Sequence, residues 1–196
     1  ATENMKDIPD SNKSFIMQNL SEPGSGRQLW HKAIKASKKI DIFINNAAVN
    51  IETPFDSAVD EWDKGWLETF QVNVYEPANI MKEALSHFQT QGAGVIISMS
   101  SWSGQRGSAL PTLPAYAASK AAVKALTQTI AKNYAKDGVL AYVISPGIVK
   151  TRMKNDKKNA ENKIHCTLLS KIGQGSVNHP IEETRIVESI DFLVRE

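Results

Sequence analysis

Four short apolar segments, separated by longer amphipathic stretches, constrain the fold of this chain more than any other feature. They are residues 15–17, 40–44, 95–100 and 140–145, and each is rich in Ile, Val, Phe or Tyr. Near-continuous apolar segments of this length are typical of strands in a parallel sheet whose two faces are both covered. The sequence therefore predicts a buried parallel sheet.

The stretches between these segments carry apolar residues at helical spacing. We expect helices over residues 27–39, 60–89 and 115–136, and a last helix over 180–194 that begins at a proline. Strands that alternate with helices form right-handed βαβ units. The predicted fold class is α/β, with a doubly wound parallel sheet in a three-layer α/β/α sandwich.

The composition fits one globular domain over residues 1–196. The chain has 196 residues, of which 41% are hydrophobic and 22% are charged. It has no internal repeat and no linker of distinct composition. The polar, Gly- and Asn-rich stretch 154–179 is expected to be a mobile connection that also helps to shape a substrate pocket.

Charge and residue usage argue against several classes of protein. The 23 basic and 21 acidic residues leave a net charge of +2, and no basic run is interleaved with aromatics, so nucleic acid is not an expected partner. The apolar segments are far shorter than the ~20 residues that span a bilayer, so no membrane partner is expected. The single cysteine, Cys166, favours a reducing, cytoplasmic location. The four histidines have no ligand spacing, so no metal is expected.

Ligands of open α/β sheets bind beyond the carboxyl ends of the strands. In this chain those ends lead into residues 19–20, 45–50, 99–107 and 146–153. All four stretches are rich in small or polar residues, as loops that face a ligand should be. We therefore expect the functional residues in these places.

Tyr116 and Lys120 are four residues apart at the start of the third predicted helix, which puts them on one face. A phenol has a pKa near ~10, and a nearby ammonium lowers the pKa of such a group. The pair can therefore exchange a proton with a carbonyl or alcohol oxygen. A Tyr-x-x-x-Lys pair can also occur on a helix without any function.

Ser101 follows the third apolar segment, in the sequence Met-Ser-Ser-Trp-Ser-Gly. A hydroxyl in this position can reach the start of the next helix and hold a substrate oxygen beside Tyr116. The alternative is an ordinary Ser/Gly turn that ends a strand.

Asn73 lies in the middle of a long predicted helix, four residues before Pro77. Proline has no N–H and crowds the carbonyl four residues earlier, so we expect a kink and a free Asn73 carbonyl that can hold a water. The alternative is a solvent-facing asparagine in a bent surface helix.

Together these motifs resemble the short-chain dehydrogenase/reductase family. The resemblance rests on IDIFINNAA, VIISMSSWSG, YAASK and VISPGIVKTRM, which occur in this order. It covers about residues 14–153 closely and residues 180–194 loosely. It implies a Rossmann-like fold and reversible hydride transfer between NAD or NADP and a carbonyl or secondary alcohol of a small molecule.

The resemblance also implies the roles of individual residues. Tyr116 would be the general acid/base, and Lys120 would lower the tyrosine pKa and hold the nicotinamide ribose. Ser101 would polarise the substrate oxygen, next to Trp102 in the substrate site. Asn73 would hold the water that links Lys120 to solvent. The residues expected to contact the coenzyme are Asn19, Leu20, Asn46, Ala47, Tyr116, Lys120, Pro146, Gly147, Ile148 and Thr151.

Several features depart from the family pattern. The Gly-rich loop Thr-Gly-x-x-x-Gly-x-Gly is absent from this sequence, and Gly24-Ser25-Gly26 follows the wrong strand to replace it. We therefore expect a Rossmann-like domain that is incomplete at its N-terminus and lacks its last strand. Ala48 stands where the family has glycine, and Asn19 stands where it has aspartate. Ser101 lies 15 residues before Tyr116 (116 − 101), which leaves Ser103 as a second possible serine.

Three hypotheses about function remain open from the sequence. The first is an NAD(P)-dependent oxidoreductase. The second is a non-catalytic dinucleotide-binding or scaffold member of the same fold, and the third is an isomerase or dehydratase. The resemblance implies a homodimer or homotetramer, to which the Ala-rich helix over residues 117–125 could contribute.

Overall fold

The computed structural model describes residues 14–147, 164–171 and 174–181. The chain divides into two compact units, Ala1–Ser145 and Pro146–Glu196. The expectation of a single domain therefore stays a prediction.

The first unit contains a parallel sheet of three strands in the order β1-β2-β3. The strands are β1 (Ile42–Asn45), β2 (Gly94–Met99) and β3 (Val139–Ile144). Asn45 pairs with Ser98 and Met99 pairs with Ile144, so the carboxyl ends of all three strands meet at one edge. Three of the four predicted strands and the parallel sheet are confirmed.

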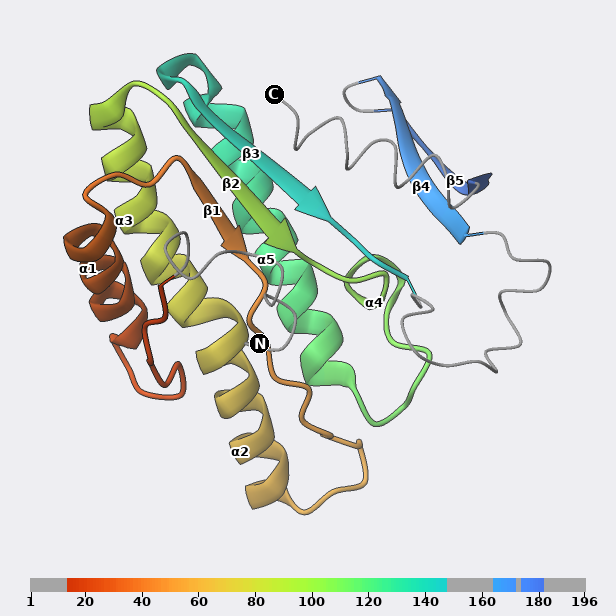
Figure 1. The fold of residues 1–196 in the computed structure, drawn as a ribbon. Coiled ribbons are helices and arrows are strands. Elements are labelled where there is room, and N and C mark those ends of the chain that lie inside the picture. The colour runs from red at the N-terminus through yellow and green to blue at the C-terminus, as the bar shows by residue number, and fades with distance from the viewer. Residues whose placement is uncertain (1–13, 148–163, 172–173, 182–196) are drawn as a thin grey trace. The chain divides into compact units, whose positions relative to one another are not determined.

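Helices connect these strands as the periodicity predicts (Figure 1). Helix α1 (Ser25–Ser37) precedes β1, and the long segment before β2 consists of α2 (Val59–Phe70), η3 (Gln71–Tyr75) and α3 (Glu76–Gln91). Between β2 and β3 lie α4 (Ser103–Arg106), α5 (Pro114–Tyr134) and the 3-10 turn η4 (Ala135–Asp137).

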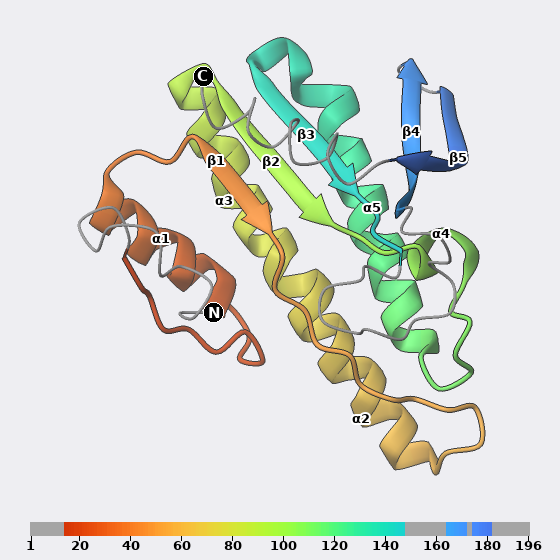
Figure 2. The same ribbon diagram turned by 45° about the vertical axis from the view of Figure 1, so that its right-hand side comes forward.

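The hydrophobic core lies between the sheet and α1, α3 and α5. Its buried members come from all of these elements: Trp30, Ile80, Met81, Ala84, Phe88, Ile96, Ile130 and Val139. Helices α3 and α5 lie behind the strands in both ribbon views (Figures 1 and 2). The opposite sheet face carries the exposed side chains of Ile42, Ile44, Leu140, Tyr142 and Ile144. The described residues thus form two of the three expected layers.

The long middle helix changes its winding at the predicted position. Residues Gln71–Tyr75 form a π-helix, and the Glu76 N–H donates to the Gln71 carbonyl. A π-turn is wider than an α-turn, so it relieves the crowding that Pro77 imposes on Asn73. Asn73 is only 2% exposed, which rules out the alternative of a solvent-facing side chain.

The strand predicted over residues 15–17 is wrong, because these residues form no strand in the structure. Phe15 and Met17 are exposed. A strand is stabilised by ladder hydrogen bonds to a neighbour. Among the described residues of the first unit the sheet contains only β1, β2 and β3, and β1 pairs with β2 alone. An apolar segment without a paired neighbour gains nothing from a strand conformation.

The second unit contains an antiparallel hairpin where we expected a mobile connection and the start of a helix. Strand β4 (Ile164–Lys171) pairs with β5 (Gln174–Ile181). The helix start predicted at Pro180 is wrong, since this residue lies in β5. In a two-stranded sheet each strand has a free edge, where proline is tolerated. The rest of that predicted helix, residues 182–194, lies outside the described residues.

Candidate active site

Lys120 is a buried cation at the junction of α5 and β2. Its side chain reaches the carboxyl end of β2, where Nζ donates to the Met99 carbonyl at 2.9 Å. Nζ also lies 5.7 Å from the centre of the Tyr116 ring, as expected for two residues one turn apart. Lys120 is 5% exposed, and burial lowers the pKa of its ammonium because it disfavours the charged form. Tyr116 and Lys120 therefore lie together at the carboxyl edge of the sheet.

The start of α5 is fixed by the loop that follows β1. The Ala115 N–H donates to Thr53 Oγ1 at 3.3 Å, and the Thr53 N–H donates to the Thr112 carbonyl at 2.8 Å. The first bond joins the β1 loop to the first turn of the helix that carries Tyr116, and the second joins it to the segment just before that helix. The position of Tyr116 relative to the sheet thus depends on a buried threonine that the sequence analysis did not identify.

Ser101 lies in the turn between β2 and α4, directly after Ser100. Its Oγ accepts the Ser103 N–H at 3.1 Å, which leaves the hydroxyl hydrogen for another acceptor. The preceding Ser100 donates its hydroxyl to the Lys120 carbonyl at 2.8 Å. The segment after this turn packs against α5 at Gly104. A Cβ there would lie 2.8 Å from backbone atoms of Lys120 and Ala121, so the close packing requires glycine.

The side-chain amide of Asn73 joins two parts of the site. Its Oδ1 accepts the Val49 N–H at 2.8 Å and its Nδ2 donates to the Val49 carbonyl at 2.9 Å. The same Nδ2 donates to Ser119 Oγ at 3.0 Å. Asn73 therefore ties the loop after β1 to the helix of Tyr116 and Lys120, a role for its side chain that the sequence argument about its carbonyl missed.

The residues expected around the coenzyme are placed unequally. Asn46 and Ala47 are exposed and follow the carboxyl end of β1. Asn19 and Leu20 lie before α1, and Asn19 Oδ1 accepts the Ser21 N–H at 3.1 Å. Pro146 and Gly147 belong to the second unit. Ile148 and Thr151 lie outside the described residues.

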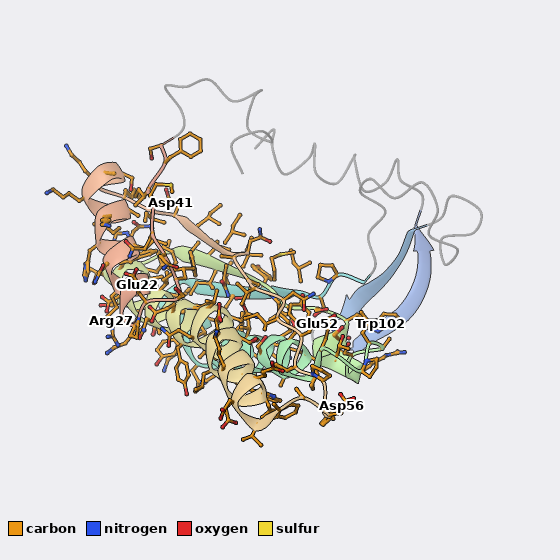
Figure 3. The ribbon with its side chains drawn as sticks, turned by 90° about the horizontal axis from the view of Figure 1, so that it is seen from below. Glu22, Arg27, Asp41, Glu52, Asp56 and Trp102 are labelled. Carbon is orange, nitrogen blue, oxygen red and sulfur yellow. The ribbon has the colours of Figure 1, made fainter. Side chains whose placement is uncertain are left out.

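Trp102 is half-exposed in the turn that carries Ser101. The Arg106 guanidinium lies 5.4 Å from the centre of its indole ring, an arrangement that favours a cation–π contact. In the view from below, Trp102 and Glu52 lie at one end of the first unit, and Glu22 and Arg27 lie at the other (Figure 3). Trp102 is thus available to a ligand on the side of the serine turn.

The chain fits one half of a nicotinamide dinucleotide better than the other. Small exposed residues after β1, the Lys120 ammonium and the Tyr116 hydroxyl suit a ribose and a flat ring. Gly24-Ser25-Gly26 begins α1, but its Gly24 and Gly26 N–H groups donate to the Glu76 carboxylate at 2.9 and 2.6 Å. The N-terminus of α1 is therefore already occupied by an anion and does not offer a site for a pyrophosphate.

Sequence comparison identifies the family. A sequence model of the family described as short chain dehydrogenase matches residues 1–162. The chain belongs to the short-chain dehydrogenase family. Within this family it is 31% identical over 183 residues to an NADPH-dependent aldehyde reductase-like protein, chloroplastic, of Arabidopsis thaliana, with 91% of this chain and 63% of that protein covered. It is also 39% identical over 112 residues to galactitol 2-dehydrogenase of Agrobacterium fabrum, with 56% and 41% covered.

Solved structures support the Rossmann-like fold. A 3-oxoacyl (acyl-carrier-protein) reductase from Agrobacterium tumefaciens C58 with NADP bound is 27% identical with a TM-score of 0.62, and 73% of this chain and 51% of that chain are covered. An NAD+-bound xylitol dehydrogenase is 25% identical with a TM-score of 0.59, and the covered shares are 67% and 49%. The chain thus spans between 41% and 63% of the length of these four proteins.

Two further features of the described residues bear on function. None of their helices has the length and apolar character that a membrane crossing requires. In the same residues no three side chains of His, Cys, Asp or Glu come together in a way that could hold a metal ion.

Proposed function

We propose that this chain carries the catalytic residues of an NAD(P)-dependent oxidoreductase that interconverts a carbonyl group and a secondary alcohol. The observation that carries the proposal is the buried Lys120 ammonium, which lies over the Tyr116 ring and donates to the Met99 carbonyl at the end of β2, where the turn with Ser101 begins. Membership of the short-chain dehydrogenase family and the names of its relatives support the same reaction class.

Tyr116 acts in this proposal as the general acid/base. In the direction of reduction its hydroxyl gives a proton to the carbonyl oxygen, and the positive charge of Lys120 stabilises the phenolate that remains. The hydroxyl of Ser101 donates to the same substrate oxygen and orients it. Asn73, one hydrogen bond from Ser119, holds a water that returns a proton from solvent through Lys120.

NAD or NADP is the proposed coenzyme, and when bound it supplies or accepts the hydride. The residues proposed to hold it are Asn19, Leu20, Asn46, Ala47, Tyr116, Lys120, Pro146, Gly147, Ile148 and Thr151. Bound NADP in one neighbouring structure and bound NAD+ in another support the coenzyme class. The choice between the two coenzymes stays open.

The proposed substrate is a small carbonyl or alcohol that Ser101, Trp102 and Tyr116 contact. The exposed indole of Trp102 favours an apolar or ring-bearing group next to the reacting carbon.

We also propose a homodimer or homotetramer and a cytoplasmic location. Ala121 and Ala125 are exposed on α5, where small side chains permit close approach of a second helix. Sedimentation at micromolar concentration and cell fractionation test these two points.

Replacement of one hydroxyl tests the proposed reaction. The intact protein is assayed with NADH and with NADPH against a panel of aldehydes and ketones, with absorbance of the reduced nicotinamide as the readout. Tyr116→Phe should lower kcat/KM by about 10³-fold, because general acid–base groups contribute about 10² to 10⁴. Tyr134→Phe, at the end of the same helix, is the matched control and should retain activity.

Three outcomes would count against the proposal. Full activity of Tyr116→Phe would exclude the tyrosine mechanism. Wild-type protein that binds a dinucleotide and turns over none of the panel would favour the non-catalytic or scaffold alternative. Conversion of a substrate without any change in the nicotinamide absorbance would favour an isomerase or dehydratase.

A further inference from the structure

Glu76 carries a buried carboxylate whose oxygens accept four hydrogen bonds. Besides the N–H groups of Gly24 and Gly26, the Gln71 side chain donates to Oε1 at 2.7 Å and the Asn79 side chain donates to Oε2 at 3.4 Å. The residue is 1% exposed. The N-terminus of α1 also attracts the negative charge. A carboxylate with this many donors is an integral part of the structure.

The same carboxylate closes the π-helical turn η3. Gln71 is the first residue of the turn and Glu76 is the residue directly after it. The two residues are joined twice, by the Glu76 N–H to the Gln71 carbonyl and by the Gln71 amide to the Glu76 carboxylate. A π-turn is rare and is often found at functional sites. Here a side-chain clamp spans it from end to end.

Asn73 lies inside the clamped turn and faces the proposed active site. Its amide binds Val49 in the loop after β1 and Ser119 in α5. Ser119 Oγ in turn donates to the Tyr116 carbonyl at 2.7 Å. Hydrogen bonds therefore join the N-terminus of α1 to Glu76 and Gln71 on one side of η3, and Asn73 to Val49 and to the helix of Tyr116 on the other, and the backbone of η3 connects the two sets.

Gly26 makes this approach possible. A Cβ at this position would lie 2.5 Å from the Glu76 carbonyl oxygen and 2.9 Å from its carboxylate. Only glycine lets α1 come close enough for its N–H groups to reach the carboxylate. The contact thus depends on specific residues of both helices.

We propose that Glu76 is a positioning residue, whose carboxylate anchors the π-turn to α1 and so holds the Asn73 amide against the β1 loop and α5. This inference rests on the proposed function for its kinetic consequence. It does not rest on that function for its structural consequence, since Asn73 Oδ1 binds the Val49 N–H directly. The exchange rate of the Val49 amide therefore reports whether Asn73 is in place.

Glu76→Gln removes the negative charge and replaces one carboxylate oxygen by an NH₂ group. This group cannot accept a hydrogen bond from a glycine N–H or from the Gln71 side chain. Glu83→Gln is the matched control, because Glu83 also joins α3 to α1, through Arg27 Nε at 3.9 Å, but does not touch η3. We expect Val49 amide exchange to become faster in Glu76→Gln than in Glu83→Gln. We also expect kcat of the folded protein to fall about tenfold, with substrate KM nearly unchanged, because small misplacements of catalytic groups are costly.

A double-mutant cycle separates positioning from simple stabilisation. In an Asn73→Ala background Glu76→Gln should change kcat by less than about twofold, since residues that act through each other are not additive. Additive losses, or a Val49 exchange rate equal to that of Glu83→Gln, would overturn the inference. If Glu76→Gln does not fold, Gln71→Leu opens the clamp without touching the charge and must speed Val49 exchange for the inference to hold.

The two proposals fail in different ways. Wild-type protein without oxidoreductase activity would contradict the proposed function, while faster Val49 exchange in Glu76→Gln would still support the positioning role. An active wild type whose Glu76→Gln variant keeps its kcat and its Val49 protection would contradict the positioning role alone.

Discussion

Glu76 and Lys120 are two buried charges of opposite sign, and they differ in how many hydrogen-bond partners surround them. The Glu76 carboxylate has four donors, whereas the Lys120 ammonium has one protein acceptor within the described residues, the Met99 carbonyl. Burial by itself raises the pKa of Glu76, but the hydrogen bonds from Gly26, Gly24, Asn79 and Gln71 together outweigh it and leave the pKa lowered. For Lys120 burial is the dominant effect and lowers its pKa.

This difference suits the two charges to different roles, Glu76 to stabilising the fold and Lys120 to the proposed reaction. A fully bonded carboxylate stabilises the fold and stays ionised. An ammonium with incomplete partners costs stability, and retains donors that a substrate or coenzyme can use. Removal of each group should therefore have opposite consequences for stability and activity.

The largest expected effect is the loss of activity in Lys120→Met. Without the cation the phenolate of Tyr116 loses its stabilising charge, so kcat/KM should fall about 10³-fold. The free energy of unfolding should change by less than about 1 kcal/mol, because an apolar side chain can replace a buried charge at little cost. Steady-state assays and urea denaturation measure the two quantities. Lys124→Met, one turn further along α5, is the control, and equal activity of the two variants would break the comparison.

Glu76→Ala should show the opposite pattern in stability. The variant leaves the Gly24 and Gly26 N–H groups without their acceptor, and two unsatisfied groups predict a loss of about 3 kcal/mol. Glu83→Ala should lose about 1 kcal/mol or less, because its ion pair with Arg27 is partly exposed. Denaturant titration of both variants checks this expectation. Similar losses of unfolding free energy in the two variants would show that the Glu76 carboxylate contributes no more to stability than the partly exposed Glu83.

Two glycines sharpen the same contrast. A methyl group at Gly26 clashes with the Glu76 backbone, and one at Gly104 clashes with the Lys120 backbone. Each substitution by alanine should cost about 2 kcal/mol of stability, as overpacking typically does. Only Gly104→Ala moves the Ser101 turn away from Lys120, so kcat/KM should fall further in this variant than in Gly26→Ala. Assays at a temperature where both are folded compare them.

The smallest expected effect is on the pH dependence of stability. For Glu76 the folded-state pKa lies below the ordinary value of 4.5, so its contribution is complete above pH 4.5 and is lost as the pH falls through the folded-state pKa. For Lys120 the folded-state pKa lies below 10.5, so stability rises with pH between the folded-state pKa and 10.5. Urea titrations across pH should show the acid loss weakened in Glu76→Gln and the alkaline rise absent from Lys120→Met.

Much of the first unit could be predicted from local patterns. The apolar segments over 40–44, 95–100 and 140–145 became β1, β2 and β3, since each carries enough β-branched and apolar residues to be buried in a sheet. The proline four residues after Asn73 marked the change in helix winding. The spacing of Tyr116 and Lys120 was sufficient to put them on one face of α5.

Other features could not be read from local patterns. The segment over residues 15–17 has the composition of a strand but pairs with no other described segment, and the stretch expected to be a mobile connection contains β4 and most of β5. Glu76 drew no attention, because a glutamate on an amphipathic helix is ordinary until a second helix presents two N–H groups to it. Ser119 and Thr53 were not predicted either, because their hydrogen bonds to Asn73 and Ala115 join residues that are far apart in the sequence.

The sequence by itself determined the three strands that pair in the first unit and the long helices around them, and which residues have the chemistry for proton transfer, because periodicity and side-chain type are local properties. Only the tertiary structure decided that Asn73 holds Val49 and Ser119, that Glu76 fills the N-terminus of α1, and that Lys120 reaches Met99. These contacts join residues about 20 to 50 positions apart, and their energy depends on burial, which no local pattern contains.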